Sequence, residues 1–348
     1  MAHRVIGWST GNVGAHAVRA VVERPGLELV GLYVRSEAKA GRDAGQLVGI
    51  DALGVTATSD VDELVATDAD VVIHAPLPSL VHGDDPDADL ATICRLLASG
   101  KDVITVVGYM YPAVHGDEVV DRLTAACETG QATFHGTGLN PGWMGEIVPL
   151  TMSALSKRID AITVTEISDF ARYPSAEIMF SMMGFGSHPD EFERTSRRRA
   201  HWLNGLFREN ITLMAHGLGV ELDRVDDQLE LDLATETYEV AAGTIEAGSV
   251  AGQRWVWTGV LDGRAVLTHE TVWRMGPAAG AAWPTGDHSI VIAGEPAMDL
   301  RFGGRWLSDG LLATAMHAVN AIEVVAAAGP GIKTFLDLPP IFGKGALR

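Results

Sequence analysis

The sequence predicts an α/β fold in which a doubly wound parallel sheet is joined to a second α+β domain with a mixed or antiparallel sheet. Three observations predict this fold. An apolar strand at residues 4–8 runs into a glycine-rich turn and the start of a helix. Strand and helix patterns then alternate as far as about residue 135, as a doubly wound sheet requires. Beyond about residue 146, long segments alternate apolar and polar residues, which is typical of strands with one buried face.

The glycine-rich turn at residues 7–14 reads GWSTGNVG and predicts a dinucleotide-binding site. Gly7 permits the tight turn that leaves the strand, Gly11 lets backbone N–H groups approach a pyrophosphate, and Gly14 lets the helix pack on the strand. The N-terminus of this helix supplies the positive end of a dipole. A second strand at residues 27–34 follows at the distance that a βαβ unit requires. We therefore expect a Rossmann domain, and the alternative is a glycine turn with a structural role only.

The end of the second strand predicts which dinucleotide binds. An NAD site needs a carboxylate there to accept hydrogen bonds from the ribose hydroxyls, whereas Arg35, Ser36 and Lys39 suit a 2′-phosphate. Glu37 leaves NAD possible, and a solvated basic turn is the alternative without a function. We expect NADP as the cofactor. The residues expected to bind it are Gly7, Ser9, Thr10, Gly11, Asn12, Val13, Gly14, Arg35, Ser36, Lys39, His74, Ala75, Pro76 and Gly108.

The composition limits the class of protein. A chain of 348 residues with 47% hydrophobic content can bury a large core and divide into two domains. The net charge of −19 makes nucleic acid and anionic membrane surfaces poor partners. The N-terminus has no signal-peptide pattern, and no apolar run reaches the roughly 20 residues that span a bilayer, so we expect a cytoplasmic protein. The histidines show no metal-ligand spacing, and we expect no metal.

Two features predict the domain boundaries. The strand and helix alternation breaks at residues 136–143, and a strongly apolar helix occupies residues 310–328. Between them, a basic run at residues 197–199 is expected to lie exposed on a helix. The second domain should contain an exposed mixed sheet, which commonly pairs across a two-fold axis, so we expect a homodimer. The predicted organisation is a dinucleotide-binding domain at 1–145, a substrate and dimerisation domain at 146–309, and a C-terminal helix and tail at 310–348.

Four motifs carry a resemblance to a known family: GWSTGNVG at 7–14, KAGRDAG at 39–45, GTGLNPG at 136–142 and TFLDLPP at 334–340. The chain resembles the dihydrodipicolinate-reductase-like oxidoreductases, and more closely the 2,4-diaminopentanoate dehydrogenase and native amine dehydrogenase branch. The resemblance runs over nearly the whole chain. It implies a Rossmann domain, a mixed α/β substrate and dimerisation domain, and a C-terminal helix that returns to the first domain. It also implies reversible NAD(P)-dependent deamination of a small amine to a ketone, with hydride transfer in the interdomain cleft.

Two departures from the family pattern bear on the reaction. Dihydrodipicolinate reductases carry a paired-histidine signature, whereas the nearest stretch here, residues 185–190, holds only His188, so a role in lysine biosynthesis is not expected. Amine dehydrogenases of this branch resemble one another in having a glutamate directly after the strand that corresponds to residues 102–107. Here that turn reads VGYMYP at 107–112 and has no carboxylate. The alternatives are a ketone or imine reductase that does not use ammonia, and a non-catalytic NADP-binding sensor.

Other side chains are candidates for the acid–base chemistry that the glutamate performs. Tyr109 lies in the same turn and could donate a proton, Glu166 could carry a proton at the end of a strand, and Asn140 could make a fixed polar contact. Simple pocket lining or a solvated surface is the alternative for each of them. His74 and His135 end buried strands at the same edge, where a structural role is the commoner one. The residues expected to bind the amine or carbonyl substrate are Tyr111, Trp143, Asp169 and Tyr173.

Overall fold

The computed structural model describes residues 2–303 and 306–347 of the chain. Contacts between residues group the chain into two compact units. Unit 1 consists of Met1–Trp143 and Asp309–Arg348, and unit 2 consists of Met144–Ser308. Each unit has its own sheet, and each is described below by itself.

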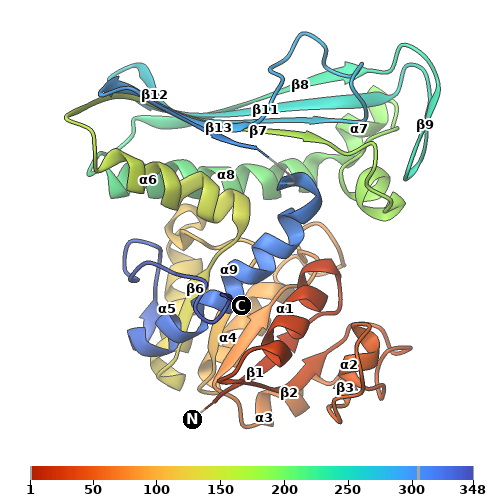
Figure 1. The fold of residues 1–348 in the computed structure, drawn as a ribbon, viewed down its shortest axis with the longest axis vertical. Helices are drawn as coiled ribbons and strands as arrows, with labels where there is room; N and C mark the ends of the chain where they lie inside the picture. The colour runs from red at the N-terminus through yellow and green to blue at the C-terminus, as the bar shows by residue number, and fades with distance from the viewer. Residues whose placement is uncertain (1, 304–305, 348) are drawn as a thin grey trace. The chain divides into compact units, whose positions relative to one another are not determined.

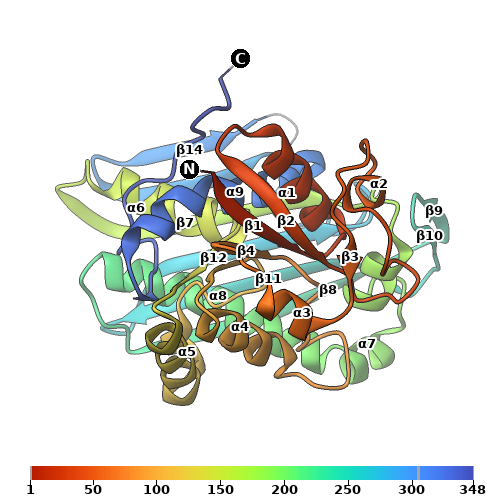
Figure 2. The same cartoon turned by 90° about the horizontal axis from the view of Figure 1, so that it is seen from below.

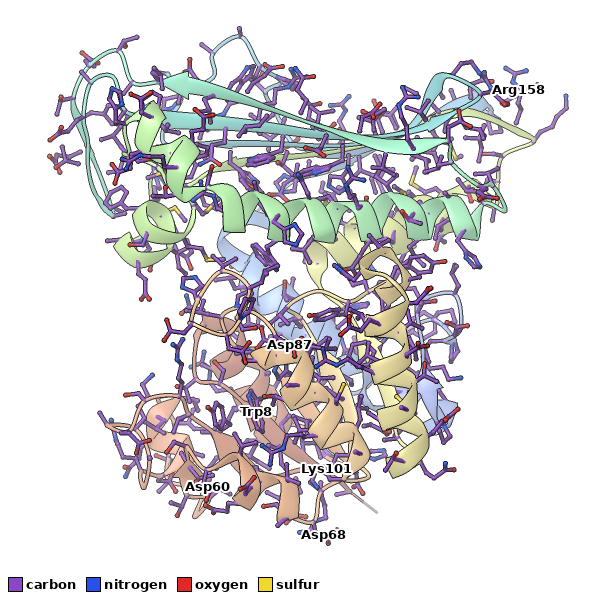
Figure 3. All side chains as sticks on the ribbon, turned by 180° about the vertical axis from the view of Figure 1, so that it is seen from behind. Trp8, Asp60, Asp68, Asp87, Lys101 and Arg158 are labelled. Carbon is purple, nitrogen blue, oxygen red and sulfur yellow. The ribbon has the colours of Figure 1, made fainter. Side chains whose placement is uncertain are left out.

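Unit 1 is built on a seven-stranded sheet in which all neighbouring strands are parallel. In spatial order the strands are β15 (Gly331–Ile332), β6 (Thr133–Gly136), β5 (Asp102–Thr105), β4 (Val71–His74), β1 (His3–Trp8), β2 (Leu27–Tyr33) and β3 (Ala57–Thr58). The central strands are buried on both faces, which explains their continuous apolar sequence. This order confirms the predicted doubly wound parallel sheet. Trp8 closes β1 at the carboxyl edge of the sheet, whereas Lys101 and Asp68 lie toward the opposite edge (Figure 3).

Helices cover both faces of this sheet (Figure 1). Apolar side chains of α1 (Asn12–Glu23) and α9 (Trp306–Ala328) share one buried cluster with the strands, and α1 lies directly against β1 and β2 (Figure 2). The opposite cluster contains side chains of α3 (Val61–Ala66), α4 (Ala88–Ala98) and α5 (Asp117–Gly130). The short elements α2 (Ala44–Leu47) and η1 (Pro112–His115) lie in the connections. The sheet is thus enclosed on both faces, as a parallel sheet requires.

Within the described residues, the segment Asp309–Ala328 of α9 is long and apolar enough to cross a membrane by length and composition alone. Polar residues at 317, 320 and 323 interrupt this segment, which is why the sequence pattern does not predict a run of that length. Ala315, Val319, Ile322 and Val325 are almost fully buried in the core of unit 1, together with strands β1 and β4. The apolar composition of α9 therefore matches its packing on the sheet.

Unit 2 is built on a six-stranded mixed sheet, which confirms the predicted second domain. Strands β7 and β12 are parallel, and all other neighbours are antiparallel. Helices α6 (Val148–Ser153) and α8 (Arg197–Gly217) lie along one face of the sheet (Figure 1), α7 (Pro189–Thr195) precedes α8, and β9 (Tyr238–Val240) and β10 (Gly243–Ile245) form a separate hairpin. In spatial order the sheet is β14 (Met298–Phe302), β13 (His288–Glu295), β7 (Arg158–Asp169), β12 (Arg264–Arg274), β11 (Val250–Leu261) and β8 (Arg224–Leu233).

The alternating pattern of β11 shows why this sheet has one buried face. Trp255 and Trp257 point into the core, where the ring of Trp257 stacks on Phe207 of α8 with 3.9 Å between ring centres. Arg254 is half-buried and forms ion pairs with Glu230 and Glu270 on the neighbouring strands. Period-two alternation therefore places aromatic residues under the helix and charged residues on the opposite face.

Candidate active site

The glycine-rich loop between β1 and α1 folds back tightly over the first turn of the helix. A Cβ atom on Gly14 would lie only 2.3 Å from the backbone oxygen of Ser9, so only glycine fits there. Ser9 has a φ of 111°, and its hydroxyl accepts a hydrogen bond of 3.0 Å from the Gly11 N–H. On Gly7, a Cβ would lie 2.8 Å from the Val18 side chain. Two of the three glycines are thus required for the close approach of strand, loop and helix.

Gly11 has a different role from these two glycines. The nearest atom to a Cβ at Gly11 would be the Ser9 hydroxyl at 3.5 Å, so the loop is open at this position. Gly11 is the N-cap residue of α1 and has no side chain to cap the helix. Because first-turn N–H groups have no acceptors within their own helix, they fit an anionic ligand such as a pyrophosphate. The residues present therefore fit a bound dinucleotide.

Basic side chains lie beside this loop at the end of β2. The Lys39 Nζ donates a hydrogen bond of 3.0 Å to the Thr10 hydroxyl, so the loop and the segment after β2 are joined. Arg35 and Ser36 are exposed, and a Cβ on Gly83 would lie 4.0 Å from the Arg35 Nη2. The Glu37 carboxylate accepts a hydrogen bond of 2.9 Å from the Ser59 hydroxyl, on the β3 side. The structure thus brings Lys39 next to Thr10 in the loop.

The ends of β1 and β4 add aromatic and buried polar groups. The rings of Trp8 and Tyr33 stack with 4.2 Å between their centres. The imidazole of His74 is fully buried, and its Nδ1 lies 3.0 Å from the Thr105 hydroxyl. Burial lowers the pKa of His74 to about 4, although Asp89 opposes this shift. His74 therefore joins β4 to β5 as a neutral ring. Its contact with the cofactor, like those of Ala75 and Pro76, stays a prediction.

The turn after β5 packs closely on the end of β6. Gly108 has a φ of 134° and Tyr109 a φ of 62°, and a Cβ on Gly136 would lie 2.4 Å from the Tyr109 backbone oxygen. The Tyr109 ring is half-buried and lies 5.3 Å from the ring of His115. Burial and the charge of Asp337 raise the pKa of the half-buried Tyr111. This turn therefore lies next to the C-terminal tail, which the sequence pattern does not indicate.

The tail after α9 returns along β6 as strand β15 and covers two buried histidines. The His135 Nδ1 lies 2.7 Å from the backbone oxygen of Lys333, and the His317 Nδ1 lies 2.6 Å from the Thr137 hydroxyl. The Phe335 ring contacts both imidazoles, with ring centres 5.1 and 5.8 Å apart. Burial lowers the pKa of each histidine to about 4. The TFLDLPP motif is the one sequence signal that could have pointed to this arrangement.

The segment Leu139–Ile147 follows β6 and contains a cis peptide bond between Asn140 and Pro141. Gly142 has a φ of 132°, and the Trp143 N–H donates to the Gly138 oxygen at 3.0 Å. Asn140 and Trp143 are half-buried. Both residues therefore lie on the chain that leaves the carboxyl edge of the unit 1 sheet, and their roles stay predictions.

Unit 2 places Glu166 in an aromatic group at the end of β7. The Glu166 Oε1 accepts hydrogen bonds from the Trp273 indole N–H at 2.7 Å and from the Ser168 hydroxyl at 3.1 Å. The ring of Phe170 lies 6.5 Å from Trp273 and 6.3 Å from Tyr173. The carboxylate is therefore held in one orientation beside apolar rings. The sequence pattern indicates Glu166 and Tyr173 but not Trp273, Ser168 or Phe170. Trp273 and Ser168 look like ordinary strand residues, and Phe170 directly follows β7.

Asp169 is exposed and has a different environment from the one expected. Its Oδ1 accepts hydrogen bonds from the backbone N–H groups of Ala171 at 2.9 Å and Gly276 at 3.1 Å. These bonds connect the turns that follow β7 and β12. A role of Asp169 in substrate binding stays a prediction. In the part of the chain that the structure describes, no group of three or more histidine, cysteine, aspartate or glutamate side chains could hold a metal ion.

Comparisons with known proteins cover nearly the whole chain. The family model for the 2,4-diaminopentanoate dehydrogenase C-terminal domain matches residues 144–343, and the model for the dihydrodipicolinate reductase N-terminus matches residues 4–83. An amine dehydrogenase of Streptomyces virginiae is 33% identical, and the match covers 97% of each chain. A 2,4-diaminopentanoate dehydrogenase of Acetoanaerobium sticklandii is 22% identical over 97% of this chain and 93% of its own.

Two solved structures resemble this chain in fold. The amine dehydrogenase from Mycobacterium smegmatis has a TM-score of 0.81 at 21% identity, and the match covers 98% of this chain and 97% of that chain. The biliverdin reductase from Synechocystis, solved with biliverdin and NADP⁺, has a TM-score of 0.53 at 13% identity. Its match covers 92% of this chain and 90% of that chain. At these identities the likeness shows the fold alone.

The buried histidines predict a dependence of stability on pH. His74, His135 and His317 have pKa values lowered by burial to about 4, whereas a histidine in the unfolded chain titrates near 6.5. Below pH 6.5 the unfolded chain therefore binds more protons, and stability is lost as the pH falls from about 6.5 toward 4. Each histidine contributes up to about 1.4 kcal/mol per pH unit in that window.

Urea unfolding at pH 7.5, 6.5 and 5.5 measures this dependence. The variant His317→Gln should reduce the loss of unfolding free energy between pH 6.5 and 5.5 by about 1 kcal/mol, because it removes one of the buried groups. His201→Gln, at an exposed histidine of α8, is the control for the loss of an imidazole that is not buried. A free energy of unfolding that does not change over this range would contradict the neutral buried imidazoles.

Proposed function

The chain belongs to the 2,4-diaminopentanoate dehydrogenase family of NAD(P)-dependent oxidoreductases, and we propose that it catalyses reversible oxidative deamination of a small amine to a ketone. The observation that carries this proposal is the match to an amine dehydrogenase at 33% identity over 97% of both chains. A bound nicotinamide cofactor would supply the hydride acceptor for the carbon that bears the amine. Water would then replace nitrogen on that carbon, so that the products would be the ketone, ammonium, the reduced cofactor and one proton. The protein's own groups bind, orient and move protons around this exchange.

We propose NADP as the preferred cofactor. The support is the cluster of Arg35, Ser36 and Lys39 at the end of β2, with the Lys39 ammonium already held against Thr10 of the glycine-rich loop. Relatives with this fold have been solved with NADP⁺ and with NAD, so the fold does not choose between them. The Arg35 guanidinium could donate two parallel hydrogen bonds to a 2′-phosphate. This contact favours NADP, because NAD has only a hydroxyl at that position.

The variant Arg35→Ala tests this preference. It should weaken NADP⁺ binding by roughly tenfold to a hundredfold, which corresponds to the loss of one charge-assisted contact of about 1.5–3 kcal/mol. Binding of NAD⁺ should change by less than about twofold. Titration of both cofactors by calorimetry measures the two affinities, with Arg158→Ala, an exposed arginine of unit 2, as the control for a lost surface charge. Equal losses for the two cofactors would contradict the assignment.

We propose that Glu166 is the proton carrier in place of the missing family glutamate. Its carboxylate is half-buried and fixed by Trp273 and Ser168, and aromatic rings nearby reduce its contact with water. Tyr109 would donate a hydrogen bond to the carbonyl oxygen, and Asn140 would provide a fixed polar contact. Tyr111, Trp143, Asp169 and Tyr173 are the proposed substrate contacts.

The variant Glu166→Gln keeps the shape of the side chain but removes its ability to accept a proton. We expect kcat for amine oxidation to fall by about 10²- to 10⁴-fold, the usual contribution of a general base. Cofactor affinity should stay unchanged. Asp160→Asn, on the same strand but exposed and paired with Arg158, is the matched control. Wild-type rates in Glu166→Gln would exclude this role.

A ketone or imine reductase is the second candidate function. The turn at 107–112 carries Tyr109 and no carboxylate, and a tyrosine beside a carbonyl can support hydride transfer without ammonia. A screen of ketones with NADPH, with and without ammonia, separates the two reactions. Product amine that forms only with ammonia supports the deaminating enzyme, and alcohol formation without ammonia supports the reductase. Tight cofactor binding with no turnover of any amine or ketone would indicate a sensor.

We also propose that the protein works as a cytoplasmic homodimer that binds neither nucleic acid nor membranes. The net charge of −19 opposes contact with polyanions, and apolar residues of α9 are buried in unit 1. Helices α6 and α8 lie on the same face of the unit 2 sheet, which supports pairing of two copies through the other face.

A further inference from the structure

The aspartate of the KAGRDAG motif at residues 39–45 holds a loop of unit 1 closed. Asp43 lies in the connection between β2 and β3, and its side chain is half-buried. The backbone N–H groups that donate to its two carboxylate oxygens, at distances of 2.8–3.3 Å, are those of Gly45, Gln46, Leu53 and Gly54. One side chain therefore joins both ends of residues 44–54, which we call the Asp43 loop.

These contacts exceed those of an ordinary helix cap. The bonds from Gly45 and Gln46 to the Asp43 Oδ1 cap the first turn of α2, as an aspartate at this position usually does. The Leu53 N–H is shared by both carboxylate oxygens at 3.1 Å, and the Gly54 N–H donates to Oδ2 at 2.8 Å. A cap does not need this second pair of donors, which lies ten and eleven positions further along the chain. The carboxylate therefore also closes the loop.

The Asp43 loop is anchored to the core of unit 1. Ala44 and Val48 are buried in the cluster that contains the apolar face of α1. The Arg19 Nη1 of α1 donates a hydrogen bond of 2.6 Å to the Val48 oxygen. A Cβ on Gly45 would lie 2.0 Å from the Asp51 oxygen, so only glycine allows the chain to approach itself so closely. The loop is thus fixed on the helix whose N-terminus faces the proposed pyrophosphate.

The chain that leads into Asp43 carries Lys39. Gly41 has a φ of 78°, and its N–H donates a hydrogen bond of 2.8 Å to the Ala57 oxygen of β3. Asp43 itself forms an antiparallel bridge with the residue before Ala57. Lys39 lies two positions before Gly41, and its Nζ donates to the Thr10 hydroxyl at 3.0 Å. The segment that presents Lys39 to the glycine-rich loop is therefore fixed at its far end by the bridge that Asp43 closes.

We propose that Asp43 is a positioning residue for recognition of the 2′-phosphate of the cofactor. Its carboxylate closes the Asp43 loop, fixes the preceding segment, and so holds the Lys39 ammonium beside Thr10, where the ammonium meets the phosphate. Asp43 acts through Lys39 and not by contact with the cofactor, because a carboxylate repels a phosphate. This role rests on the proposed preference for NADP.

The variant Asp43→Asn separates the charge of Asp43 from its geometry. Removal of a negative charge near a phosphate favours binding of NADP⁺, whereas release of Lys39 weakens it. The amide nitrogen of asparagine cannot accept a hydrogen bond, so N–H groups at one end of the Asp43 loop would face a second donor. Asparagine caps helices as well as aspartate does, and the variant should therefore fold. A lower affinity for NADP⁺ would report the geometry and not the charge.

Calorimetric titration of the full chain with NADP⁺ and NAD⁺ tests this role. Asp43→Asn should weaken NADP⁺ binding roughly fivefold to tenfold and NAD⁺ binding by less than about twofold. Asp51→Asn, at an exposed aspartate of the same loop, is the charge control and should bind NADP⁺ at least as tightly as the wild type. In the Lys39→Met background, Asp43→Asn should cause no further loss, because both changes remove the same contact. Equal losses for the two cofactors, or losses that add in the double variant, would overturn the proposal.

Hydrogen exchange of the free protein tests the positioning without any cofactor. Asp43→Asn should speed exchange at the Leu53 and Gly54 N–H groups, and also at the hydrogen-bonded N–H groups of Lys39 and Gly41. Faster exchange confined to the Asp43 loop would overturn the proposal. A wild-type protein that binds NADP⁺ and NAD⁺ equally would contradict the proposed cofactor preference, and exchange at Lys39 would still decide whether Asp43 holds this segment.

Discussion

The close approach of the Ser9 backbone oxygen to Gly14 is the constraint on which the candidate site depends. The Ser9 oxygen occupies the space that a Cβ atom at position 14 would need. Glycine at position 14 therefore allows the tight loop that joins β1 to α1. That loop leaves Gly11 open at the helix N-terminus and brings Thr10 within hydrogen-bond distance of Lys39. A backbone contact thus leaves the helix N-terminus open for the proposed pyrophosphate and places Lys39 beside it.

In unit 2, side chains rather than backbone atoms fix the orientation of the Glu166 carboxylate. Glu166 is oriented by side chains from its own strand and from β12, which lies beside β7 in parallel register. Parallel pairing places Glu166 opposite Thr271 and puts Trp273 two residues further along, within reach of the carboxylate. The chemistry proposed for Glu166 therefore depends on the register of one strand pair.

The sequence is informative where the structure depends on local patterns. The glycine spacing and the βαβ pattern predict the parallel sheet, and period-two alternation predicts the mixed sheet, because each records which face of an element is buried. Contacts between distant residues leave no such pattern. Thr137 meets His317 across 180 positions, and Trp273 meets Glu166 across 107. Arg199 shows a different limit. Its place in a basic run predicts an exposed side chain, whereas the residue is only 5% exposed, because a phenyl ring of α7 covers the planar face of its guanidinium.

Binding of NADP⁺ and NAD⁺ to the variant Gly11→Ala tests most directly the claim that residues 7–14 hold a dinucleotide. The methyl group would meet no protein atom closer than 3.5 Å, and the residue has a φ of −68°, so the free protein should keep its stability. A bound pyrophosphate would meet that methyl group. We therefore predict an unchanged unfolding midpoint and at least tenfold weaker binding of both cofactors. Cofactor affinities equal to those of the wild type would contradict the account.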